Sequence, residues 1–175
     1  MKTKDICLIG VLAALLSIGA PFTVPIGPIP ISLASFVVYL AGALLSWKRG
    51  TLAVVVYLLL GAVGLPVFSG FQGGLQKLAG VTGGFLIGDI PCALITGAFA
   101  DHAKDKKWMV PVGMVLGTAA LYALGTIWFM VQTHNPLGAA LGACVIPFLP
   151  GDAIKIAAAT VLTLALRKRL ESLLG

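Results

Sequence analysis

Residues 110–131 read VPVGMVLGTAALYALGTIWFMV, 22 residues without a charged side chain. A helix needs about 20 mostly apolar residues to cross the hydrocarbon core of a bilayer, so this stretch predicts a transmembrane helix. Five further stretches suit the same interpretation: Ile6 to about Ala20, Ile29 to Ser46, Thr51 to about Pro66, Thr82 to Ala100, and Gly151 to about Leu166, with a softer apolar stretch, Leu137 to Leu149, before the last. The sequence predicts an all-α membrane protein, a six-transmembrane-helix bundle that forms a single domain over residues 1–175.

The composition indicates a lipid bilayer as the main surrounding of this chain. Hydrophobic residues make up 59% of the 175, charged residues make up 10%, and the mean hydropathy is +1.05. An ordinary soluble domain carries about 25% charged residues. Too little of the chain is polar to cover a soluble globule, which excludes a cytosolic enzyme and a disordered protein. We therefore interpret the excess of positive residues behind the formal charge of +6 as a signal of membrane topology. We expect no nucleic-acid partner.

The positive charges alternate between the predicted loops. One set of loops and ends holds Lys2, Lys4, Lys48, Arg49, Lys104, Lys106, Lys107, Arg167, Lys168 and Arg169. The opposite side holds Lys77, and Lys155 lies within the last span. Because positive loops stay in the cytoplasm, both termini are predicted to be cytoplasmic and Lys77 to be outside.

The outer connections are predicted to hold the functional site. Residues 21–30 contain four prolines and no charge, which predicts a stiff extended loop. Residues 64–85 are apolar, aromatic and rich in glycine, so we expect this segment to fold back over the bundle. Non-helical backbone at membrane depth is tolerated where it lines a cavity.

Three ionisable residues fall inside predicted spans: Asp89, Asp152 and Lys155. Such groups are costly in a membrane and are functional candidates by default. Asp152 and Lys155 are three residues apart and share one helix face, so they either pair with each other or bind a small polar ligand. For Asp89, pairing with Lys155 is favoured over direct ligand contact.

No catalytic or metal-binding pattern competes with this interpretation. Cys7, Cys92 and Cys144 are far apart in apolar sequence, without metal-ligand spacing. The glycine-rich stretch 70–84 lacks the lysine and hydroxyl residue of a phosphate-binding loop. We therefore expect no enzyme activity, no metal, no cofactor, and no ATP hydrolysis by this chain.

The order and spacing of several motifs resemble the biotin-specific S component of energy-coupling factor transporters. The motifs are Gly64-Leu65-Pro66-Val67-Phe68, Gly73-Gly74, Gly80-Val81-Thr82-Gly83-Gly84-Phe85, and Pro147-Phe148-Leu149-Pro150-Gly151-Asp152-Ala153-Ile154-Lys155. The proline-glycine-aspartate-x-x-lysine segment is the most specific of them, and the resemblance extends over the whole chain.

The resemblance implies a six-helix bundle in the cytoplasmic membrane of a prokaryote that captures biotin from outside. It assigns Asp152 and Lys155 to the bicyclic head of biotin, with help from the amide of Gln72 beside Gly73. It also implies a transmembrane coupling subunit and two cytoplasmic ATPase subunits, which alone use ATP. The apolar parts of biotin need an apolar wall, for which Phe68, Phe71 and Phe85 are candidates.

Three positions depart from the family pattern. Val81 replaces a frequent proline, Phe85 a common tyrosine, and Leu86 an arginine that some members carry near the ligand. The last difference leaves two possibilities for the biotin carboxylate: it stays near water, or Lys77 supplies the charge.

A smooth face on the first span leaves two further possibilities open. Gly10, Ala13, Ala14 and Ser17 lie at helical spacing, and small residues permit close helix approach. This face packs inside the bundle or, as we predict, contacts the coupling subunit. Alternative functions are an S component for another small vitamin and an autonomous membrane carrier.

Overall fold

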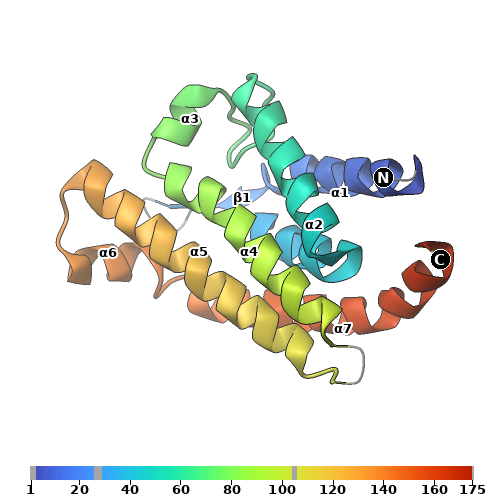
Figure 1. The fold of residues 1–175 in the computed structure, drawn as a ribbon. Helices are drawn as coiled ribbons and strands as arrows, with labels where there is room; N and C mark the ends of the chain where they lie inside the picture. The colour runs from blue at the N-terminus through green and yellow to red at the C-terminus, as the bar shows by residue number, and fades with distance from the viewer. Residues whose placement is uncertain (1–2, 26–28, 104–105, 175) are drawn as a thin grey trace.

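The computed structural model describes residues 3–25, 29–103 and 106–174, with side chains described as far as Arg167. Lys2, Lys104, residues 26–28 of the proline-rich loop, and the side chains of Lys168 and Arg169 lie outside this part of the chain. Helices dominate the fold (Figure 1). They are α1 (Thr3–Gly19), α2 (Ala34–Ala62), α3 (Leu75–Ala79), α4 (Gly83–Asp101), α5 (Met109–Thr133), α6 (Leu137–Cys144) and α7 (Leu149–Leu174).

Four helices are long and apolar enough to cross a membrane: α2, α4, α5 and the Leu149–Arg167 part of α7. The prediction of a helical membrane protein is thus confirmed, but not the number of six spans. Four helices meet the criterion instead of six for two reasons. Helix α1 has only 17 residues, and α2 joins two of the predicted spans into one element.

Helix α2 is a helical hairpin. Its residue Ser46 has φ 76° and ψ 159°, outside the helical region. A Cβ added to Gly50 would lie 2.4 Å from the carbonyl oxygen of Ala41. Nine residues along a continuous helix are about 13 Å apart, so the chain must reverse direction between them. The reversal at Ser46 lies at the predicted end of the second span, just before Lys48 and Arg49 of the predicted connecting loop.

Polar contacts hold the reversal to its neighbours. The Asp101 carboxylate, at the end of α4, accepts hydrogen bonds from the Ser46 hydroxyl (2.6 Å) and the Trp47 backbone N–H (3.2 Å). Arg49, just beyond it, forms an ion pair of 3.2 Å with Asp5 of α1. These contacts fix α1 and α4 at one end of the hairpin.

Helix α4 lies at the centre of the bundle, between α2 and α5. Small residues permit this close packing. A Cβ on Gly42 of α2 would lie 2.5 Å from the Ala93 carbonyl oxygen of α4. In α4, a Cβ on Gly84 would lie 2.2 Å from the Trp128 side chain of α5, and one on Gly88 would lie 2.9 Å from the Leu121 side chain. Helix α7 packs mainly against α2, and α1 packs on the outer side of α2.

The two ends of the bundle differ in kind. Both ends of the described chain lie at one end of the molecule, whereas α3 and α6 lie at the other (Figure 1). The predicted proline-rich loop forms a short antiparallel hairpin there, in which β1 (Thr23–Val24) pairs with β2 (Ile31–Ser32). The extended conformation follows from the prolines, but the strand pairing was not predicted. The predicted third span ends at Ala62, before Pro66, because Gly64 turns the chain with φ 109°.

Candidate functional site

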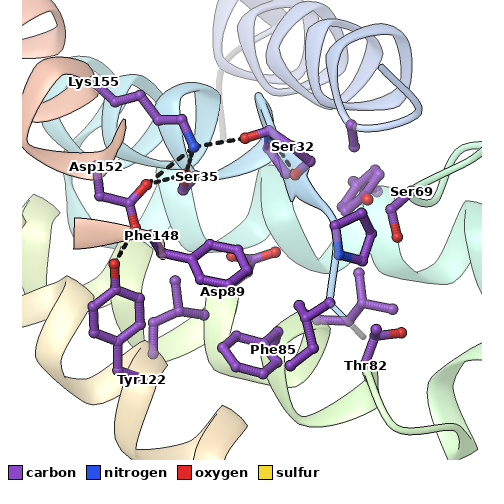
Figure 2. A pocket seen from close by; sticks show the side chains of 17 residues that line it. Ser32, Ser35, Ser69, Thr82, Phe85, Asp89, Tyr122, Phe148, Asp152 and Lys155 are labelled. Atoms are coloured by element: carbon purple, nitrogen blue, oxygen red, sulfur yellow. Dashed lines mark hydrogen bonds and ion pairs between the residues drawn. The ribbon is translucent and has the colours of Figure 1, made fainter. Parts of the chain in front are cut away.

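A cavity lies among α2, α4, α5, α7 and the β1–β2 hairpin. Its volume, counted as the space that the centre of a water molecule can reach, is about 80 Å³. That is several times the volume that one water molecule needs. Apolar residues form most of its wall, and a few polar side chains converge on it (Figure 2). This combination is typical of a small-molecule site.

The first turns of α7 place Asp152 and Lys155 in this cavity. Pro150 suits the start of a helix, and a carboxylate in the first turn is stabilised by the helix dipole. The Lys155 Nζ lies 3.0 Å from Oδ1 of Asp152, and both side chains are largely buried. The two residues therefore share one helix face, as their spacing predicts, and pair with each other, which is one of the two alternatives that the sequence leaves open.

Two neighbouring helices hold the Asp152 carboxylate. Tyr122 of α5 donates a hydrogen bond of 2.5 Å to Oδ2, and Ser35 of α2 donates one of 3.3 Å to Oδ1. A carboxylate accepts about four hydrogen bonds, so Oδ2 retains acceptor capacity. The Lys155 ammonium, in contrast, already donates to three acceptors: Asp152, the Ser35 hydroxyl (3.0 Å) and the Ser32 carbonyl (2.7 Å). An ammonium has three protons, so a ligand that accepts from Lys155 must replace one of these partners.

Asp89 differs from the prediction. It lines the same cavity from α4 and is only 5% exposed, yet among the described residues it forms no ion pair or hydrogen bond with Lys155 or with any other side chain. Lys155 is fully occupied by α2, α7 and β2, which explains why the predicted pairing does not form.

The three candidate phenylalanines occupy different surroundings. Phe85 lines the cavity and stacks on Phe148, with ring centroids 6.4 Å apart. Phe68 is fully buried behind the cavity wall, edge-on to Tyr57 at 5.6 Å. Phe71 is 61% exposed and contacts Phe22 of the loop after α1. Only Phe85 is thus in a position to form the expected apolar wall.

The remaining predicted residues lie elsewhere in the outer loop. Gln72, Gly73 and Lys77 line a second, more open hollow with Gln76. Partial burial lowers the pKa of the Lys77 ammonium below its usual value. The structure therefore does not bring Gln72 beside Asp152 and Lys155. Leu86, at the position of the missing arginine, does line the main cavity.

Several cavity residues were not predicted. Tyr122 lies on α5, Ser35 on α2, Ser32 on β2, and Phe148 in the turn before α7. Each of them contacts the Asp152–Lys155 pair or the apolar wall. A hydroxyl group within an apolar span could have marked Tyr122 and Ser35 as candidates. The sequence does not show, however, which faces of the helices meet at the cavity.

The smooth face of α1 divides into two parts. Ala13 is buried, at 2% exposed, whereas Gly10 and Ala14 are exposed and Ser17 is half-buried. A Cβ added to Gly10 would meet nothing within 4 Å. Three of the four predicted residues thus lie on the side of α1 that faces away from the bundle.

Long apolar helices around a small, partly polar cavity define a multi-pass membrane protein with a site for a small molecule. The chain belongs to the BioY family, whose model matches residues 1–172. It is 40% identical to a biotin transporter BioY of Thermotoga maritima, over 91% of this chain and 93% of that protein. It is 35% identical to a probable biotin transporter BioY of Pyrococcus horikoshii, over 93% and 95% of the two chains.

One solved structure has the same fold. It is a crystal structure of the S-component for biotin from an ECF-type ABC transporter, with a TM-score of 0.88 and 30% identity, covering 96% of this chain and 95% of that one. The resemblance found from the sequence motifs is therefore confirmed. These relatives are transporters, which agrees with the expectation that this chain is no enzyme, and they indicate a prokaryotic cell membrane as its location.

Proposed function

We propose that this chain captures biotin at the outer face of the membrane and delivers it inward as the substrate-binding subunit of an energy-coupling factor transporter. Family membership and the S-component fold support this function. The observation that carries it is the buried Asp152–Lys155 pair, which is held in a cavity by α2, α5 and β2.

The chemistry of the pair suits the ureido ring of biotin, which offers two N–H donors and one carbonyl acceptor. Asp152 accepts one N–H through its remaining lone pair, and Lys155 exchanges one of its partners for the ureido oxygen. A water-excluded site strengthens both charge-assisted hydrogen bonds. Phe85, Phe148 and Leu86 then form the wall for the thiophane ring and valeryl chain.

The valeryl carboxylate points towards the glycine-rich loop in this proposal. Leu86 offers it no charge, and Lys77 is the basic residue of that loop. The loop residues near Lys77 in the chain cover this end of biotin: Phe71, Gln72 and Gly73. Phe68 does not touch biotin in this proposal, and it supports the cavity wall by packing against Tyr57.

We further propose that six helical segments cross the membrane: α1, the two halves of α2, α4, α5 and α7. They form a single domain with both termini in the cytoplasm, which the distribution of positive loops supports. Lys77 and α6 then lie outside. The reversal at Ser46 and the α4–α5 connection lie inside.

Energy comes from partners in this proposal. A transmembrane coupling subunit contacts Gly10, Ala14 and Ser17 on the outer side of α1, and two cytoplasmic ATPase subunits use ATP. The chain itself binds biotin without a cofactor, within the lipid bilayer.

Equilibrium binding tests the function directly. Purified protein in detergent micelles should bind biotin at a 1:1 ratio without chemical change of the ligand, and thiamine, riboflavin and lipoate should not compete. Binding of one of these vitamins in place of biotin would identify an S component of other specificity. Binding of none of them would contradict the proposal.

A further inference from the structure

Two unpartnered polar groups line the cavity away from the Asp152–Lys155 pair. Asp89 of α4 is 5% exposed and Tyr57 of α2 is 0% exposed, and both belong to the cavity wall. Within the described residues, no hydrogen bond or ion pair reaches the Asp89 carboxyl group, and the Tyr57 hydroxyl has no partner either. Figure 2 shows Asp89 in the middle of the labelled group without a dashed line to any of its members.

An unpaired carboxyl group inside a membrane bundle is costly. A buried polar group without a partner costs free energy as well, so each such group calls for an explanation. The explanation cannot be a structural ion pair, because Lys155 already donates all its protons to Ser32, Ser35 and Asp152. Of the two carboxyl groups in the described cavity wall, Asp152 is held by neighbours whereas Asp89 is not, and the Tyr57 hydroxyl is unpartnered as well.

The ureido ring has one more donor than the Asp152–Lys155 pair can receive. Its two N–H groups point to opposite sides of the carbonyl group, so a single carboxylate cannot accept both at full strength while Lys155 binds the oxygen between them. Gln72 was the expected third partner, but it lies in the second hollow with Lys77. The cavity itself offers Asp89 instead.

We propose that Asp89 is a ligand-binding residue that accepts the second N–H of a cyclic urea, opposite the N–H bound by Asp152, with Tyr57 beside it on the same wall. This inference rests on the proposed function, since it takes biotin as the ligand. An ionised Asp89 accepts this N–H through a charge-assisted hydrogen bond, which the neutral amide of an asparagine does not replace. The cavity then selects ligands with two donors flanking one acceptor.

Two derivatives of biotin, each methylated on one ureido nitrogen, provide the test. Each lacks one of the two donors and keeps the other. The proteins are the wild type, Asp89→Asn, Asp152→Asn and, as a control, Asp101→Asn, which makes the same change in α4 outside the cavity.

Asp89→Asn should weaken biotin binding roughly tenfold to a hundredfold, the usual loss for a charge-assisted hydrogen bond. It should also remove most of the affinity difference between biotin and one methylated isomer, and leave the difference for the other isomer unchanged. Asp152→Asn should show the reverse preference. Asp101→Asn should keep the wild-type ratio of the two isomers.

Thermal unfolding of the ligand-free proteins distinguishes a ligand-binding role of Asp89 from a structural one. Because the Asp89 carboxyl has no partner, Asp89→Asn and Asp89→Leu should unfold at the wild-type temperature or above it. Wild-type biotin affinity in folded Asp89→Asn, or an isomer preference that Asp89→Asn and Asp152→Asn share, would overturn the inference. A marked loss of stability in both Asp89 variants would also overturn it. If the wild type itself binds no biotin, the proposed function fails before this inference is reached.

Discussion

The ammonium of Lys155 and the carboxylate of Asp152 depend on each other. Both are buried, so removing one leaves the other charge with poorer partners, and stability and ligand binding can fall together. Shape-preserving changes separate the two effects better than alanine does. Asp152→Asn keeps the volume and replaces an anionic acceptor by a neutral one, and Lys155→Met keeps much of the apolar packing.

Each of these two variants should weaken biotin binding by about 1.5–3 kcal/mol, or about ten- to a hundredfold, because each loses a charge-assisted hydrogen bond. Equilibrium binding together with thermal unfolding in detergent measures this. Thr163→Val is a matched control, since Thr163 is a buried α7 residue outside the cavity whose hydroxyl has no partner among the described residues. Unchanged affinity in two well-folded variants would show that the pair is structural.

Residue-scale prediction succeeded where one helix determines the geometry. Asp152 and Lys155 are three residues apart on α7, so their contact follows from helix periodicity. Prediction failed where several helices meet. Tyr122 approaches Asp152 from α5, and Gln72 lies away from the pair although its loop was correctly expected on the same side of the bundle. The register between packed helices depends on tertiary contacts that periodicity does not contain.

At the scale of elements, α2 carries the least expected feature. The sequence placed Lys48 and Arg49 in a loop between two spans, whereas the non-helical residue is Ser46, with a positive φ that a non-glycine residue rarely adopts. Hydrogen bonds to Asp101 hold this conformation. Asp101 is 55 residues further along the chain, so no local pattern could place the reversal to the residue.

Gly50→Ala should destabilise the hairpin. The new Cβ would lie 2.4 Å from the Ala41 carbonyl oxygen, a backbone atom that cannot move aside without shifting a helix. Overpacking of this kind costs about 1–3 kcal/mol. Gly10→Ala is the matched control in α1, because its Cβ would meet nothing within 4 Å and alanine favours a helix. A lower unfolding temperature for Gly50→Ala alone would agree, and equal behaviour of the two variants would contradict the prediction.

The whole molecule has one loop-rich end with few charges and one basic end with the chain termini (Figure 1), and the predicted membrane orientation follows from this division. With the three native cysteines replaced, a cysteine at position 77 should react with an impermeant reagent on intact cells. A cysteine at position 105, outside the described residues, should react only after the cells are permeabilised. The alternation of positive loops gives this expectation. Labelling of position 105 on intact cells would show that the orientation is the opposite of the one predicted.

Helix α1 supplies the last prediction, which concerns assembly. Adjacent residues on it have opposite surroundings: Ala13 is buried in the bundle, and Ala14 is exposed. Ala14→Trp should leave biotin binding by the isolated chain within about twofold of the wild type, because no bundle contact is disturbed. It should abolish biotin uptake in cells that contain the coupling and ATPase subunits, because a bulky side chain holds two helices apart where small residues allow close approach.

Ala13→Trp is the internal contrast for this experiment. At 2% exposure its new ring has no room within the bundle, so thermal stability, binding and uptake should all fall. Co-purification with the coupling subunit completes the test, and Ala14→Trp should lose the partner while it retains biotin. Normal uptake and co-purification by Ala14→Trp would place the partner contact on another helix. Loss of binding in Ala14→Trp equal to that in Ala13→Trp would show that this side of α1 supports the bundle itself.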